Sequence, residues 1–142
     1  DQDFRGVMEG CAHRPDEGTW ITEDFVEAYA QLHALGFAHS VETWNQEGEL
    51  VGGLYGVSLG SMFFGESMFA RSSNASKVAF VQLARQLEQW GMECIDCQIM
   101  NPHLKTLGAT HVPRDIFLDT LKHCMNAPTK RGTWAFDSTS EV

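Results

Sequence analysis

A predicted antiparallel hairpin near the middle of the chain most constrains the fold. Residues 38 to 44 (AHSVETW) alternate, residues 45 to 48 (NQEG) have turn composition, and residues 49 to 57 (ELVGGLYGV) form the returning arm. Short alternating runs joined by a turn are typical of a β-hairpin. Residues 61 to 69 (SMFFGESMF) predict a further strand, interrupted at Gly65. The glycines in this region suggest bulges, or a place where a ligand comes close.

Helical patterns lie on both sides of the hairpin. Residues 22 to 36 begin with Thr-Glu-Asp and end at glycine, which predicts a helix. Its apolar stripe is expected in the core and comprises Phe25, Val26, Tyr29, Leu32 and Leu35. Residues 74 to 90 predict a second helix, with an apolar face of Val78, Val81, Ala84 and Leu87. A short helical turn near residues 104 to 107 and a last helix after Pro113 follow.

Residues 93 to 100 predict one more strand, directly after the second long helix. The element order is then helix, hairpin, strand, helix, strand, helix, which is typical of an α+β fold with one helical crossover. We predict a single domain over residues 1–142, with a polar tail over residues 127–142. Within that tail, Trp134 and Phe136 are expected to pack back onto the body.

Composition sets broad limits on the class of protein. An apolar content of 43% in 142 residues argues for one globular domain. No apolar run reaches the roughly 18 residues of a membrane span, and the first residues do not resemble a signal peptide. We expect a cytoplasmic protein. Because the chain does not begin with Met, we also expect a fragment or a processed chain.

The charge is unevenly distributed along the chain. The net charge is -9, and residues 1–50 carry all of this excess, so the first third is a poor surface for nucleic acid. Phosphate contacts depend on local Lys and Arg. Any phosphate contact would have to come from the later bases, which are Arg71, Lys77, Arg85, Lys105, Arg114, Lys122, Lys130 and Arg131. Arg71 and Lys77, near the start of the second helix, are the candidates among them.

The four cysteines do not have the spacing of a zinc site. Cys94 and Cys97 form a close pair, but there is no second pair of that kind. On a strand, these two positions would point to opposite faces. We therefore expect buried free thiols in a reducing compartment and no metal site.

The stretch Cys94 to Met100 (CIDCQIM) places polar groups in an apolar run. If the stretch is a strand, Asp96 and Gln98 lie on one face. Glu66 is a second acid in an apolar setting, and no basic residue lies within four positions of either acid. Buried carboxylates need partners. They either pair with a core Arg or cap a backbone amide, or they line a cleft that receives a cationic ligand.

A family resemblance appears at these same segments. The chain closely resembles the bacterial leucyl/phenylalanyl-tRNA protein transferases from about residue 5 to residue 136. The matching segments, in order, are residues 9–11 (EGC), 18–21 (GTWI), 50–56 (LVGGLYG), 64–69 (FGESMF), 74–77 (NASK), 95–98 (IDCQ), Asn101, His103 and 107–109 (LGA).

The resemblance implies a GNAT-like acyltransferase fold and a transferase that needs no cofactor. Its partners would be aminoacyl-tRNA carrying Leu, Phe or, less well, Met, and proteins with an N-terminal Arg or Lys. The transfer marks those proteins for degradation by the N-end rule. No membrane partner is implied. Members of the family carry an N-terminal domain ahead of the point where this chain begins, so we expect the chain to be the catalytic C-terminal domain.

The resemblance also implies site residues. Asp96 and Gln98 match the residues that orient and polarise the attacking amine, and Glu66 matches a second acid of the site. Leu54, Phe63, Leu83 and Ile95 match the apolar pocket for the transferred side chain. Gly65 and Ser67, on either side of Glu66, are assigned to the substrate site, and Trp20 matches a tryptophan that stacks on the terminal adenosine of the tRNA.

Two other functions stay open. A GNAT-type acyl-CoA transferase would share the fold, but it should carry a Gly-rich pyrophosphate turn before a helix, and residues 74 to 77 (NASK) do not have that pattern. A non-catalytic module that binds basic N-termini is the other alternative.

Overall fold

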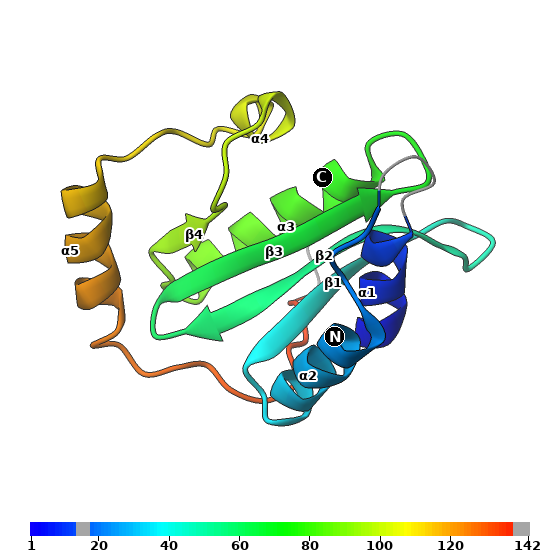
Figure 1. The fold of residues 1–142 in the computed structure, drawn as a ribbon, viewed down its shortest axis with the longest axis horizontal. Helices are drawn as coiled ribbons and strands as arrows, with labels where there is room; N and C mark the ends of the chain where they lie inside the picture. The colour runs from blue at the N-terminus through cyan, green and yellow to red at the C-terminus, as the bar shows by residue number, and fades with distance from the viewer. Residues whose placement is uncertain (14–17, 138–142) are drawn as a thin grey trace.

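The computed structural model describes residues 1–13 and 18–137 (Figure 1). The elements follow the order α1 (Phe4–Ala12), α2 (Glu23–Ala34), β1 (Ala38–Trp44), β2 (Leu50–Leu59), β3 (Met62–Ala70), α3 (Ala75–Gln89), β4 (Cys94–Asp96), α4 (Pro102–Thr106) and α5 (Arg114–Cys124). Within these residues, no helix is long and apolar enough to cross a bilayer.

The strands form one mixed sheet of order β1-β2-β3-β4. β1, β2 and β3 are antiparallel neighbours, whereas β4 runs parallel to β3 after the crossover through α3. The predicted α+β class, the hairpin and the crossover are confirmed. Pairing between β3 and β4 covers only three residue pairs, from Met62↔Cys94 to Phe64↔Asp96. Beyond that point β3 continues without β4 beside it.

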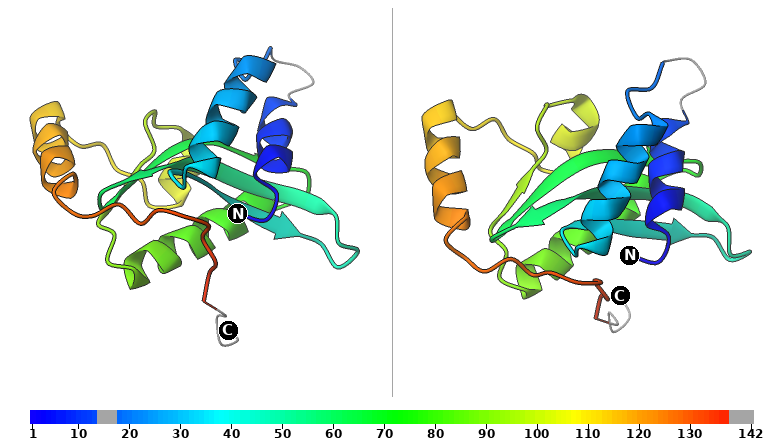
Figure 2. Two further views of the ribbon diagram at one scale, coloured as in Figure 1. Left: turned by 90° about the horizontal axis from the view of Figure 1, so that it is seen from below. Right: turned by 60° about the horizontal axis from the view of Figure 1, so that its bottom comes forward.

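Helices cover both faces of the sheet (Figure 2). α1 and α2 lie on one face, and their core contains Phe4, Val7, Met8 and Tyr55. α3 lies on the other face, over a second core of Val41, Leu54, Phe63, Leu83 and Trp134. The sheet therefore separates two apolar layers, and any opening through it joins them.

The helix predicted over residues 22 to 36 is confirmed as α2. The Thr22 side chain accepts a hydrogen bond from the Phe25 amide, and Gly36 takes a positive φ after the last turn. Most of its apolar stripe packs against the core, but Leu35 is 57% exposed, so its assignment to the core was wrong. Leu35 is the C-cap residue, where the chain has already begun to turn away.

The second long helix is confirmed as α3, but the predicted apolar face was partly wrong. Val78 and Val81 are exposed. The buried stripe instead contains Ala75, Ala79, Leu83 and Leu87. Small residues at the start of this stripe let α3 approach the sheet closely.

Helix α1 was not predicted. It contains two glycines, which weaken a helical pattern in the sequence. Gly10 is required by packing, since a Cβ there would lie 2.5 Å from the Phe69 ring. Tertiary contact with β3 thus stabilises a helix that local propensity disfavours.

The strand predicted over residues 93 to 100 is wrong beyond Asp96. β4 ends there, and Gln98 has a φ of 63°, in the left-handed region. The physical reason is local, because the Asp96 side chain accepts a hydrogen bond from the Gln98 amide and stabilises a turn instead of continued sheet pairing.

The described part of the tail packs back as expected. Trp134 is buried in the second core and stacks on His39 with ring centroids 3.7 Å apart. Phe136 packs against the same cluster and contacts Trp90 edge to face. Residues 138–142 lie outside the described residues. α5 lies apart from the sheet (Figure 1). Its C-terminal end contacts the body through a 3.0 Å pair between His123 and Glu93.

Candidate active site

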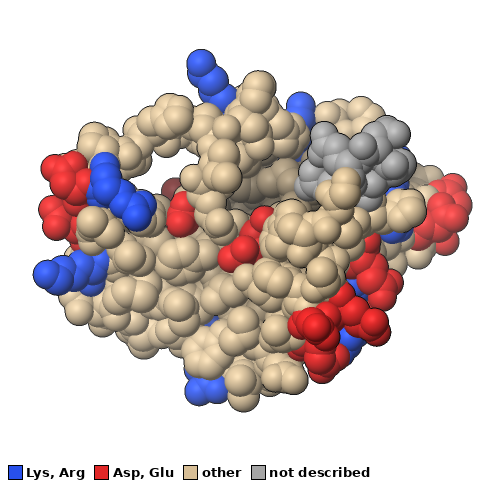
Figure 3. Space-filling view, in the orientation of Figure 1, with Lys and Arg blue, Asp and Glu red and all other residues tan. Residues whose placement is uncertain are grey.

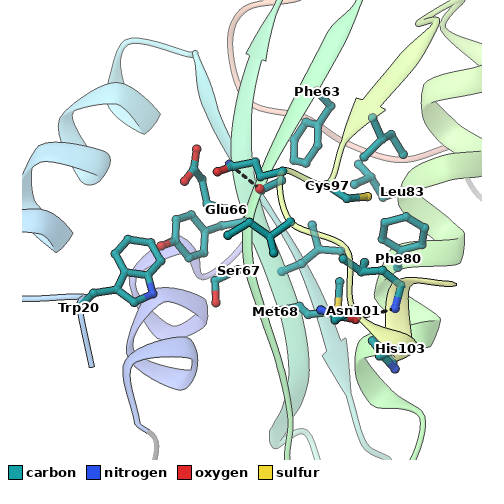
Figure 4. Close-up of a pocket in the computed structure, with 17 residues that line it drawn as sticks. Trp20, Phe63, Glu66, Ser67, Met68, Phe80, Leu83, Cys97, Asn101 and His103 are labelled. Carbon is teal, nitrogen blue, oxygen red and sulfur yellow. Dashed lines mark hydrogen bonds between the residues drawn. The ribbon is translucent and has the colours of Figure 1, made fainter. Parts of the chain in front are cut away.

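A hollow of about 540 Å³ opens where β4 leaves β3. Its walls include residues from both sides of the sheet, because the opening between β3 and β4 passes through the sheet (Figure 4). The two apolar layers meet the solvent at this point.

The apolar part of the hollow lies on the α3 side. All four residues predicted for a side-chain pocket line it, namely Leu54, Phe63, Leu83 and Ile95. Met68 and Phe80 complete this wall and were not predicted. Met68 pairs with Leu54 across β2 and β3, so strand register would have identified it once the pairing was known.

Glu66 reaches the hollow through an irregularity in β3. Tyr55 pairs with Ser67 and the next residue, Gly56, pairs with Gly65, so Glu66 has no partner on β2. This is a β-bulge, which re-aims a side chain and bends the strand. The predicted interruption at Gly65 is therefore a bulge, with β3 continuous on both sides. Glu66, Gly65 and Ser67 all line the hollow.

Gln98 bridges the gap between the separated strands. Its side-chain amide Nε2 donates a 2.8 Å hydrogen bond to the Gly65 carbonyl. Its backbone N–H donates a 2.8 Å hydrogen bond to Oδ1 of Asp96. Asp96 and Gln98 are thus brought together by a turn, not by alternation along a strand as expected. The possibility that Asp96 caps a backbone amide is realised in the same contact.

A second hollow, of about 930 Å³, lies on the other side of the turn at residues 97–99. Asp96 lines this hollow and does not line the first one. Glu66 and Gln98 line both. Figure 3 shows an opening between the body and the segment that leads to α5, with acidic side chains along its edge. Ile95, Cys97 and Ile99 also line both, so the two hollows meet along β4 and the turn after it, beside Glu66 and Gln98.

The acids of the site are not neutralised internally. Within residues 1–13 and 18–137, neither Glu66 nor Asp96 forms an ion pair, and the first hollow contains no Lys or Arg. Arg114 lines the second hollow only. Burial and the nearby Glu66 carboxylate raise the pKa of Tyr29 to about 12, so its hydroxyl is a neutral donor at physiological pH. The site carries negative charge and is open to a cation.

Trp20 stands at the rim of the first hollow. Its side chain is 52% exposed and contacts Phe25 edge to face, with ring centroids 4.9 Å apart. An exposed indole supported from one side is suited to stacking on a flat ring.

Asn101 and His103 also line the first hollow, at the start of α4. They belong to the matching segments but were given no role. The Asn101 side chain accepts a hydrogen bond from the Leu104 amide and caps α4, which explains the turn that follows β4.

The cysteines flank the site without forming a metal centre. In the described part of the chain, no group of three or more His, Cys, Asp or Glu side chains is placed to hold a metal ion. Cys11 and Cys124 are buried as predicted, but Cys94 and Cys97 are only half-buried, so the predicted burial was wrong for these two. Burial still raises the pKa of both Cys94 and Cys97, which keeps them as thiols.

The fold and the hollows define a mixed α+β domain with a cleft at the point where the sheet separates. The family model described as leucyl/phenylalanyl-tRNA protein transferase matches residues 1–122. The chain belongs to this family.

Curated relatives support the assignment over nearly the whole chain. A leucyl/phenylalanyl-tRNA--protein transferase of Nitrosospira multiformis is 56% identical over 139 residues, which cover 96% of this chain and 60% of the relative. The corresponding protein of Myxococcus xanthus is 55% identical, and the match covers 94% of this chain and 58% of that relative. The chain thus spans about three fifths of the length of these relatives.

Among solved structures, the chain is similar to AAC(6')-Iy in complex with a bisubstrate analogue, CoA-S-monomethyl-acetylneamine. The TM-score is 0.48 at 12% identity, and the match covers 96% of this chain and 90% of that one.

Proposed function

We propose that this chain is the catalytic part of an aminoacyltransferase that moves Leu or Phe, and less well Met, from aminoacyl-tRNA to proteins with an N-terminal Arg or Lys. The observation that carries the proposal is that an apolar hollow joins a second hollow, which Asp96 lines, beside Glu66 and Gln98. An apolar donor side chain suits the first hollow, and a basic acceptor residue suits the second. Such a reaction would take place in the cytoplasm.

The first hollow would select the donor by size and apolarity. Its inner wall consists of Leu54, Phe63, Met68, Phe80, Leu83 and Ile95. An apolar pocket separates side chains by only about 1–3 kcal/mol per methylene. Overlap among Leu, Phe and Met is therefore the expected behaviour.

Trp20 would hold the other end of the donor. Because it lies at the rim of the same hollow, a base stacked on it would place the ester near the junction of the two hollows. Stacking of a base on an aromatic side chain contributes about 1–3 kcal/mol. Removal of the Trp20 side chain would then weaken donor binding more than it lowers the stability of the fold.

The reaction would be aminolysis of an ester. The acceptor's neutral α-amine attacks the ester carbonyl carbon, an amide C–N bond forms, and the ester C–O bond breaks. The ribose hydroxyl of the tRNA leaves with a proton, and the amine loses one. No enzyme nucleophile is needed, so the chain supplies positioning and help with proton transfer.

Gln98 and Asp96 would supply that help. The Gln98 amide stands at the junction of the hollows, and the Asp96 carboxylate, bonded to the Gln98 backbone, lies on the acceptor side. Asp96 can accept the proton that the amine releases, and Gln98 can orient the amine. Glu66 would compensate the positive charge of the acceptor, since it has no ion-pair partner among the described residues.

One assay tests the proposal against its alternatives. The protein is incubated with labelled Leu-tRNA or with labelled acyl-CoA, and with a peptide that begins with Arg or, as a control, with Ala. We expect label on the Arg peptide from Leu-tRNA only. Incorporation from acyl-CoA would indicate a GNAT-type N-acyltransferase, and peptide binding without transfer would indicate a non-catalytic binding module.

A pair of variants assigns the role of Asp96. Asp96→Asn keeps the size of the side chain and should lower transfer by about a hundredfold or more. Asp119→Asn removes an exposed carboxylate on α5 that lines neither hollow, and should transfer as the unmodified protein does. Full activity of Asp96→Asn would remove Asp96 from the mechanism.

A further inference from the structure

Tyr55 has a buried hydroxyl that makes no hydrogen bond within the described residues. Its side chain is 0% exposed, and the hydroxyl oxygen has no partner there. An unsatisfied buried hydroxyl costs about 1–3 kcal/mol. Phe would fill the same space without this cost, so the hydroxyl does not stabilise the fold of the free protein.

Tyr55 lies beside the acid of the site. It is on β2 and pairs with Ser67 on β3, next to the bulge that carries Glu66. The Tyr55 and Glu66 side chains line the same hollow. The Tyr55 ring is held by edge-to-face contacts with Phe4 and Tyr29, with centroids 5.9 and 5.6 Å apart. These contacts on two sides hold the Tyr55 ring in place beside the bulge.

The chemistry of the hydroxyl suits a carboxylate partner. Burial, together with Cys11, Tyr29 and Glu66, raises the pKa of Tyr55, so its hydroxyl stays protonated and can donate. Glu66 also lies next to the Tyr29 hydroxyl. A carboxylate has two oxygens that together accept several hydrogen bonds. Glu66 can accept from Tyr29 and still accept from Tyr55.

We propose that Tyr55 is a positioning residue for Glu66, whose carboxylate accepts a hydrogen bond from the Tyr55 hydroxyl once the cationic side chain of a substrate is bound. This inference rests on the proposed function in one respect, that a substrate cation lies beside Glu66. The substrate cation draws the carboxylate into a single orientation, and the Tyr55 hydroxyl holds it there. The hydroxyl that is unsatisfied in the free protein is satisfied in the complex.

A matched pair of variants separates this role from a structural one. Tyr55→Phe removes only the hydroxyl, and Ser58→Ala removes another buried hydroxyl that has no partner among the described residues but lines neither hollow. We expect both variants to melt at or above the temperature of the unmodified protein. Tyr55→Phe should bind L-argininamide and an Arg-initiated peptide about tenfold more weakly, whereas Ser58→Ala should bind both unchanged. A lower melting temperature for Tyr55→Phe, or unchanged binding, would overturn the proposal.

A spectroscopic measurement tests the contact itself. The chain has only two tyrosines, so ¹³Cζ-labelled tyrosine gives two signals, which Tyr55→Phe assigns. Titration with L-argininamide should shift the Tyr55 signal, and the shift should be lost in Glu66→Gln. Because this titration needs no tRNA, a shift without any transfer activity would contradict the proposed function and still support Tyr55. Binding of L-argininamide with no change in the Tyr55 signal would refute the role of Tyr55 alone.

Discussion

Replacing Gln98 by alanine and by glycine separates the role of its side chain from the role of its backbone. Gln98 combines a positive φ of 63° with a side-chain hydrogen bond to the Gly65 carbonyl across the gap between β3 and β4. Both variants remove the amide. Only Gln98→Gly would also relieve the left-handed backbone, because glycine has no Cβ.

The expected stabilities follow from these two contributions. Loss of one exposed hydrogen bond lowers the free energy of unfolding by about 0.5–1 kcal/mol. Glycine recovers about 1 kcal/mol at a left-handed position. Gln98→Ala should therefore melt about 2–4 °C below the unmodified protein, and Gln98→Gly close to it.

Activity should follow a different order from stability. If the Gln98 amide orients the attacking amine, both variants lose transfer from Leu-tRNA to an Arg-initiated peptide by about a hundredfold. The measurement is the single-turnover rate at saturating donor, beside melting curves for the same samples. A Gln98→Gly variant that transfers at the unmodified rate would show that only the turn matters, and the reasoning about the amide would be wrong.

Three further predictions concern the neighbourhood of the hollow. Gly65→Ala should fold normally, because its Cβ would lie 3.5 Å from the Asp96 carbonyl, but it should raise KM because the methyl group occupies part of the hollow. Gly56→Ala, on the paired strand, would place its Cβ 2.6 Å from the Phe63 ring and should lower the free energy of unfolding by about 1–3 kcal/mol. Equal stabilities of the two variants in urea melts would contradict this. Trp20→Ala should raise KM for Leu-tRNA about tenfold or more. The control Trp44→Ala, at a comparably exposed tryptophan on β1, should leave KM unchanged. Equal KM values for the two variants would count against stacking on Trp20. The pKa of Tyr29 is raised to about 12 in the folded protein, so as the pH rises the unfolded chain loses this proton before the folded chain does. The stability that the neutral hydroxyl contributes below pH 10 should therefore be lost as the pH rises from about 10 to 12. Over this range the melting temperature of Tyr29→Phe should fall less steeply than that of the unmodified protein, and identical slopes would refute the shift.

The elements set by local chemistry could be predicted from the sequence. The Thr22 cap, the turn at residues 45–48 and the alternation on either side of it act over a few residues, and the structure confirms α2 and the hairpin. α1 was missed because Gly10 is required by contact with Phe69, which lies far away in the sequence. The exposed Val78 and Val81 show the same limit, since which face of α3 packs is decided by the sheet beneath it.

The candidate site could be named residue by residue, but its geometry could not be predicted. The residues Leu54, Phe63, Leu83 and Ile95 do line one hollow. The junction at Glu66, however, depends on a bulge in the register of β3, and Gln98 depends on a turn stabilised by Asp96. The glycines indicated a bulge near Gly65 but not which side chain it leaves unpaired, and the apolar composition of residues 93–100 indicated a continuous strand where the turn lies.

The most direct test of the account is the structure of the protein with an adenosine analogue in which a 3′ amide nitrogen replaces the ester oxygen and carries leucine. This analogue is a stable mimic of the donor end. The account predicts the leucine side chain among Leu54, Phe63 and Leu83, the adenine on Trp20, and the reacting carbonyl beside Gln98. A leucine side chain bound outside the first hollow, or a carbonyl distant from Gln98 and Glu66, would contradict it.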